Sequence, residues 1–286
     1  MKNFRLPKND PKSLLLFMAV SIAAGLTMIS LLFIIGYILI KGIPNLTPEL
    51  FAWEYSSENV SCMPALINTL LMTVLALLFA VPVGIGAAVY LTEYAKRGNK
   101  LVGVIGIAAE TLSGIPSIVY GLFGSIFFVN FLGLGKSLLS GALTLSVVIL
   151  PLIMRTTQEA LLAVPDSYRE GSFGLGAGKL RTVFRVILPS AVPGILSGVI
   201  LGIGRIVGES AALIFTAGTV AKAATSLFDS ARTLSVHMYA LSGEGLYIDQ
   251  TYATAVVLLV VVIIINALSE LAAKKLGGGK NGQDKR

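Results

Sequence analysis

Charged residues are scarce in this chain. Only 13% of its 286 residues are Asp, Glu, Lys or Arg, whereas soluble domains carry about 25%. Hydrophobic residues make up 55% of the chain and gather in long runs instead of at amphipathic spacing. The sequence therefore predicts an all-α integral membrane protein with several spans and excludes a soluble domain.

Residues for covalent and metal chemistry are equally few. A single cysteine, Cys62, permits no internal disulfide, and a single histidine, His237, offers no Cys/His cluster for a structural metal. The chain has no G-x-x-x-x-G-K-[ST] sequence to hold ATP phosphates. No cluster of polar residues indicates a lipid-modifying enzyme. We therefore expect neither an enzyme nor a bound cofactor or metal.

Six apolar runs are long enough to cross a membrane. A signal peptide is disfavoured for the first run, because it is too long and no small-residue cleavage site closes it. We expect it to be a retained peripheral helix over residues 14–40, after a basic leader (1–13). A transport domain over residues 65–271 follows, and then a basic, disordered tail (272–286). The runs are Leu14–Ile40, Ala65–Leu91, Leu101–Val129, Ser137–Met154, Ala191–Gly218 and Thr251–Leu271.

The distribution of basic residues predicts the orientation. With both termini in the cytoplasm, 17 Lys and Arg fall on the inside: four in the leader, three in residues 92–100, five in residues 155–189 and five in the tail. Four lie outside, and Arg205 is within a span. This bias places the 155–189 loop in the cytoplasm and explains the net charge of +7 without nucleic acid. Residues 41–64 and 220–250 are then external.

The 155–189 loop contains a helical hairpin. Ser167 followed by Glu170 is a capping-box pattern, which predicts a short helix that begins there. Glycines then interrupt the helix at Gly174, Gly176 and Gly178. A second helix is indicated by apolar residues at helical spacing, with Pro189 as its exit. These apolar residues, which would need a protein partner to cover them, are Leu180, Val183, Phe184 and Ile187.

This hairpin resembles the E-A-A-x3-G-x9-I-x-L-P loop of bacterial ABC importer permeases. The matching residues are Glu170, Gly176, Leu188 and Pro189, while Gly171 and Ser172 replace the two alanines and Val186 replaces the isoleucine. The resemblance implies a type I importer permease fold, in which these residues dock on an ATP-hydrolysing subunit. An ordinary cytoplasmic hairpin is the alternative.

Three ionisable residues, Glu110, Arg205 and Glu209, fall inside predicted spans. Each would cost at least ~2.5–3.5 kcal/mol facing lipid, so we expect them to face the bundle interior or a transport path. Arg205 and Glu209 are four residues apart on one predicted helix and can pair. Alternatives are a purely structural ion pair, and an inert Glu110 near the cytoplasmic end of its helix.

An anionic cargo would suit these residues. The Arg205 guanidinium offers a fork of donors to oxyanion oxygens, and Ser210 and Thr216 would add neutral donors. Glu209 would keep the arginine from holding the anion too tightly. Glu209 could also accept a proton from an oxyanion that carries one. Fully deprotonated sulfate carries no such proton.

Two further segments narrow the resemblance to the permease subunits of phosphate importers. They run from Gly114 to Gly124 and from Gly204 to Leu213, and the following LIFTAG sequence is similar to the PstA-type subunit in particular. The resemblance implies a multi-pass subunit of the bacterial or archaeal cytoplasmic membrane. Its implied partners are ATPase subunits (PstB-like), a second permease subunit (PstC-like) and an extracytoplasmic phosphate-binding protein.

Two alternatives remain open. The cargo could be sulfate, molybdate or tungstate, in which case that anion would compete better than phosphate for uptake. A stand-alone secondary transporter or channel is the other alternative. It would work without an ATPase and would tolerate a bulky residue at Gly176.

Overall fold

The computed structural model of this chain describes residues 11–96 and 100–277, which form helices and connecting loops without a β-strand. Parts of three predicted segments lie outside the described residues: residues 1–10 of the leader, Arg97 in the segment 92–100, and residues 278–286 of the tail. The first six residues of the predicted tail, 272–277, are helical, because the last helix continues to Gly277.

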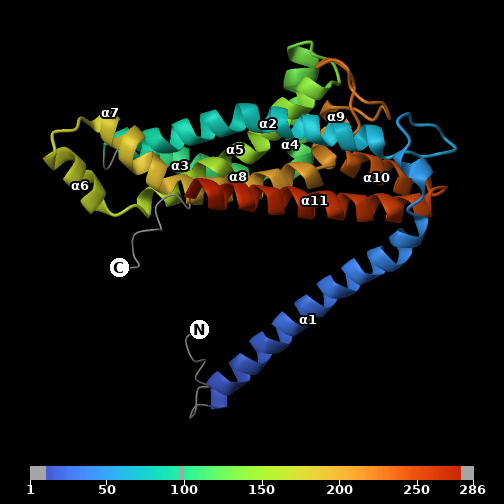
Figure 1. Cartoon of the computed structure of the whole chain (residues 1–286), viewed down its shortest axis with the longest axis horizontal. Coiled ribbons are helices and arrows are strands. Elements are labelled where there is room, and N and C mark those ends of the chain that lie inside the picture. Colours follow the sequence, from blue (N-terminus) through green and yellow to red (C-terminus); the bar gives the residue numbers. More distant parts are fainter. Residues whose placement is uncertain (1–10, 97–99, 278–286) are drawn as a thin grey trace.

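Within the described residues, five helices are long and apolar enough to cross a membrane. Four of them, α2, α5, α8 and α11, run side by side along the long axis of the molecule (Figure 1). The π-helical segment η3 (Tyr90–Tyr94) extends α2, and α7 (Lys179–Thr182) and η5 (Val183–Ile187) lead into α8. The five are α1 (Pro11–Gly42), α2 (Met63–Val89), α5 (Leu138–Leu162), α8 (Leu188–Gly208) and α11 (Ile248–Gly277).

The third predicted span is broken rather than continuous. Helix α3 (Lys100–Ser113) and helix α4 (Ser117–Gly124), which η4 (Ser125–Phe131) extends, meet at an angle of 104°. Pro116 explains the break, because proline disfavours a helical residue before it and removes a backbone donor. The pair counts as a sixth span only if both halves together cross the membrane.

Small residues bring the central helices close together. A Cβ on Gly84 of α2 would lie 2.9 Å from Ile153 of α5, and a Cβ on Gly194 of α8 would lie 2.6 Å from Ala160. The core between these helices contains Met72, Leu145 and Ile149, all fully buried. The absence of a side chain at Gly84 and Gly194 thus lets α5 approach α2 and α8 closely.

Helix α1 leaves this bundle at an angle and packs only near its C-terminal end (Figure 1). There Tyr37 meets Tyr252 of α11 edge to face at 5.8 Å. Short 3-10 turns, η1 (Ile43–Asn45) and η2 (Pro48–Phe51), connect α1 to α2. The segment 220–250, predicted to be external, contains a short helix, α10 (Leu234–Glu244).

The side chain of Asn68, on α2, forms hydrogen bonds to the segment 220–250, which was predicted to be external. Its fully buried amide donates to the carbonyls of Lys222 and Arg232 and accepts from the Ala224 N–H, at 2.8–3.1 Å. Asn68→Ala removes the partners of three partly buried backbone groups, so we expect it to lower the free energy of unfolding by about 2–4 kcal/mol. Thermal unfolding of the purified protein in detergent measures this. Asn130→Ala, which removes one exposed local bond, is the control and should change little; equal losses would contradict the prediction.

His237 of α10 is buried beside Arg232 and against the ring of Tyr55. Burial, and then the charge of Arg232, lower the pKa of His237 from 6.5 to about 4. In the unfolded chain His237 therefore binds a proton below about pH 6.5, whereas in the folded chain it binds one only below about pH 4. Stability should fall as the pH decreases through this window, by about 2 kcal/mol at about pH 5. His237→Gln should flatten this part of the melting-temperature profile; an unchanged slope would contradict it.

Candidate functional site

A cavity of about 580 Å³ brings two of the predicted site residues together. Arg205, in the last turn of α8, and Glu110, in the last turn of α3, both line it. Ser113 adds a hydroxyl from the end of α3, and Arg155 and Gln158 line the same cavity from α5. The cavity thus combines two guanidinium groups, one carboxylate and two neutral polar groups.

Helix α3, which ends at the break, forms one wall of this cavity. The carbonyls freed at the bend are satisfied locally: the Glu110 carbonyl accepts from the Ser113 hydroxyl at 2.7 Å, and the Leu112 carbonyl accepts from the Tyr120 hydroxyl at 2.6 Å. The broken backbone therefore supplies no free carbonyl at these two positions. Side chains carry the chemistry of the cavity.

Glu209 does not pair with Arg205, contrary to the sequence-based prediction. Helix α8 ends at Gly208, and Glu209 is its C-terminal cap with extended backbone (ψ 128°). Its carboxylate accepts from the Ala212 N–H at 3.2 Å instead. Ion pairs in the described part of the chain are found instead at Arg155–Glu159, Arg169–Glu93 and Arg169–Asp166. The pairing predicted from the helical spacing was wrong, because the predicted fifth span consists of two helices, α8 and α9 (Ala211–Thr216).

The two hydroxyl residues proposed as neutral donors also lie away from this cavity. Ser210 caps α9 and is not among the lining residues. Thr216 is fully buried, and its hydroxyl donates to the Ala212 carbonyl at 2.9 Å. Thr216 also packs against Gly124 of α4. It therefore stabilises the contact between α4 and α9 and is not available to a cargo.

Arg155 and Gln158 were missed as lining residues, because the fourth span was predicted to end at Met154. Helix α5 instead continues for eight more residues to Leu162. The two residues also line a neighbouring cavity of about 690 Å³ with Lys96 and Glu159. The helical spacing of Arg155, Gln158, Glu159 and Leu162, all on one face, is the signal that could have revealed them.

The predicted hairpin is present and lies at one end of the bundle (Figure 1). Its first arm, α6 (Asp166–Gly174), begins with Pro165 as cap, and the Ser167–Glu170 capping box does not form. Proline before Asp166 explains the earlier start, because it fixes the cap in an extended conformation. Gly171 and Glu170 lie on α6, and Glu170 is exposed.

Gly176 forms the turn between the two arms. Its φ is +80°, in the left-handed region. The Gly176 N–H donates to the Phe173 carbonyl at 2.9 Å, and the Ala177 N–H donates to the Ser172 carbonyl at 3.1 Å. This is a Schellman ending, in which the left-handed residue is normally glycine. The Ser172 hydroxyl lies 2.8 Å from that of Thr182 and joins the two arms.

The second arm does not end at Pro189. Residues Lys179–Gly208 form one continuous helical segment, with the π-helical turn η5 just before Leu188 and Pro189. The extra residue of a π-turn accommodates the missing N–H of proline. The predicted apolar stripe is divided: Val183 and Ile187 are buried in the core, while Leu180 and Phe184 are exposed.

Sequence comparison assigns the class of protein. Residues 80–278 match the family described as "Binding-protein-dependent transport system inner membrane component". The chain belongs to this family, and it is a multi-pass membrane subunit of an ABC importer.

Several curated relatives have phosphate in their names. The chain is 30% identical over 287 residues to "Phosphate transport system permease protein PstA" of Mycobacterium leprae, which covers 95% of this chain and 91% of that protein. It is 32% identical to "Phosphate transport system permease protein PstC" of Mesorhizobium japonicum, over 80% and 77% of the two chains. It is also 34% identical to "Probable ABC transporter permease protein YqgI" of Bacillus subtilis, over 85% and 87%.

Solved structures show the same fold. A chain of a bacterial alginate ABC transporter, in complex with an alginate-bound periplasmic protein, superposes with a TM-score of 0.70 at 16% identity, covering 93% of this chain and 96% of that one. A chain of the inward-facing MetNI methionine ABC transporter gives 0.59 at 20% identity, covering 74% and 93%. The predicted type I ABC importer permease fold is confirmed.

Proposed function

We propose that this chain is the PstA-like permease subunit of an ATP-driven phosphate importer. The observation that carries the proposal is the cavity in which Arg205 and Arg155 lie with Glu110, Ser113 and Gln158. Planar guanidinium groups bind oxyanion oxygens in pairs, and the amide of Gln158 can complete the hydrogen bonds. The names of the relatives support phosphate as the anion.

Glu110 is proposed to provide selectivity. Phosphate carries at least one proton near neutral pH and can donate a hydrogen bond to a carboxylate, whereas fully deprotonated sulfate cannot. A carboxylate facing sulfate would only repel it. Glu110 lines the same cavity as Arg205, whereas Glu209 does not, and this supports Glu110 for the role.

The hairpin is proposed to couple this path to ATP hydrolysis. Glu170, Gly176, Leu188 and Pro189 match the family loop, and Gly171 and Ser172 stand at the positions of its two alanines. Exposed apolar side chains at Phe173, Leu175 and Leu180 leave a surface for an ATPase subunit. The second permease subunit and an external phosphate-binding protein would complete the complex, with both termini of this chain in the cytoplasm. Movement of the hairpin would shift the subunits between outward-open and inward-open states.

Radiolabelled phosphate uptake with competing anions tests the substrate. In cells carrying the complete complex, excess phosphate should block uptake, and excess sulfate, molybdate or tungstate should not. Glu110→Gln should weaken this discrimination, because the amide no longer repels sulfate. Sulfate competing as well as phosphate against the unaltered complex would contradict the proposal.

A further inference from the structure

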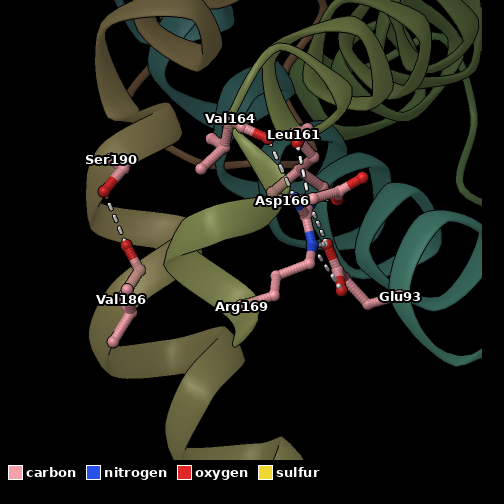
Figure 2. A network of polar contacts seen from close by, with 7 residues as sticks. All are labelled: Glu93, Leu161, Val164, Asp166, Arg169, Val186 and Ser190. Atoms are coloured by element: carbon pink, nitrogen blue, oxygen red, sulfur yellow. Dashed lines mark hydrogen bonds and ion pairs between the residues drawn. The ribbon is translucent and has the colours of Figure 1, made fainter. Parts of the chain in front are cut away.

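A buried polar cluster lies where the hairpin meets the bundle (Figure 2). At its centre is Arg169 of α6. Its Nη2 donates to Glu93 Oε1 at 2.6 Å, and its Nε donates to the same carboxylate at 3.2 Å. The Arg169 side chain is 17% exposed and that of Glu93 is 8% exposed. Glu93 belongs to η3, at the end of α2, so this contact joins two elements that are distant in the sequence.

Arg169 also binds the end of α5. Nη1 donates to the Val164 carbonyl at 2.9 Å and Nη2 to the Leu161 carbonyl at 3.0 Å. Both carbonyls lie at the C-terminal end of α5, where the regular helical hydrogen bonds stop. Nη1 further donates to Asp166 at 3.1 Å. All five guanidinium N–H groups therefore have acceptors. The hydrogen bond to Glu93 is the main cause that raises the pKa of Arg169.

A second contact joins the other arm of the hairpin to the same segment. The Lys179 Nζ, at the start of α7, lies 5.1 Å from the centre of the Tyr94 ring in η3. Both arms thus contact the end of α2. Helices α5 and α8 are connected to the hairpin by the chain itself, whereas α2 is connected to it only through side chains.

We propose that the Arg169–Glu93 pair is a tie that transmits movement of the hairpin to α2, with Arg169 as the positioning residue. The inference rests on the proposed coupling role of the hairpin. Without the tie, the hairpin would move α5 and α8 while the end of α2 lagged. Because α2 packs against α5 and α5 lines the proposed path, a lag would strain this contact and leave the path beside α5 partly open. ATP would then be hydrolysed without completed transport.

Glu93→Gln tests the tie, because it removes the charge at α2 and leaves the bonds from Arg169 to α5 and Asp166 in place. Asp166→Asn is the matched control, since it removes the exposed carboxylate partner (79% exposed) of the same arginine. The complete complex, reconstituted in proteoliposomes, is assayed for anion imported per ATP hydrolysed and for retention of the ATPase subunits. Glu93→Gln should reduce the import ratio about 10-fold with full retention. Asp166→Asn should change it less than about twofold.

Arg169→Lys should lose as much coupling as Glu93→Gln, because an ammonium group has three donors and no fork. An unchanged import ratio in Glu93→Gln would overturn the proposal. So would a loss of import that matches a loss of ATPase subunits, since the pair would then only stabilise the assembly. The ratio can be measured with whichever oxyanion the unaltered complex imports. A wrong substrate assignment would therefore show in the unaltered complex, and a wrong tie would show only in the variants.

Discussion

Replacing Arg205 by glutamine is expected to reduce phosphate uptake about 100-fold, because a charged, forked pair of hydrogen bonds to the anion is lost. Arg205 lies half-buried in the last turn of α8 and lines the cavity shared with Glu110 and Arg155. Arg205→Lys keeps the charge without the fork, so we expect an intermediate loss. Initial rates of radiolabelled phosphate uptake, normalised to the amount of complex in the membrane, measure the effect.

Lys136→Gln is the control for a general loss of positive charge, since Lys136 is exposed before α5 and lies outside both cavities. It should retain uptake within about twofold. Equal uptake by the Arg205→Gln complex and the unaltered complex would contradict the assignment of Arg205 to the transport path.

Replacing Gly176 by valine is expected to abolish coupling to ATP hydrolysis. The φ of +80° costs about 1–2 kcal/mol for a residue with a Cβ, and more for a β-branched one. No neighbouring atom would meet the added Cβ, so the effect comes from the backbone alone. We expect the loss of hairpin geometry to reduce both ATPase retention and phosphate uptake by about 10-fold or more.

A graded series makes this prediction specific. Asn enters the left-handed region more readily than other non-glycine residues, so loss should increase from Gly176→Asn through Gly176→Ala to Gly176→Val. Gly178→Ala is the control, because Gly178 has an ordinary φ of −73° and space for a Cβ. Full phosphate uptake by the Gly176→Val protein without an ATPase would favour the stand-alone transporter instead.

The sequence was sufficient to predict the membrane class, the long helices and the hairpin, because long apolar runs and glycine positions act locally. The close approach at Gly84 was also foreseeable, since small residues mark tight helix contacts. Prolines were harder to interpret. Pro116 accompanies a sharp break, whereas the chain continues as a helix through Pro189. The difference depends on the neighbouring turns, which a lone proline does not reveal.

The site was less accessible from the sequence. The prediction that Arg205 pairs with Glu209 assumed that both residues lie on one continuous helix. Helix α8 ends at Gly208, so Glu209 lies outside it. Arg155 was assigned to a loop because apolar runs end before helices do: α5 continues as a polar helix beyond the run. The Arg169–Glu93 pair joins residues 76 positions apart, and such a contact leaves no periodic signal in one sequence.

Reconstituted transport tests the central claim most directly. The complete complex in proteoliposomes, supplied with its external binding protein, is given radiolabelled phosphate or sulfate with and without ATP. The account predicts accumulation of phosphate that requires ATP, with little accumulation of sulfate. Accumulation of phosphate to the same level without ATP, or ATP-driven accumulation of sulfate in preference to phosphate, would contradict it.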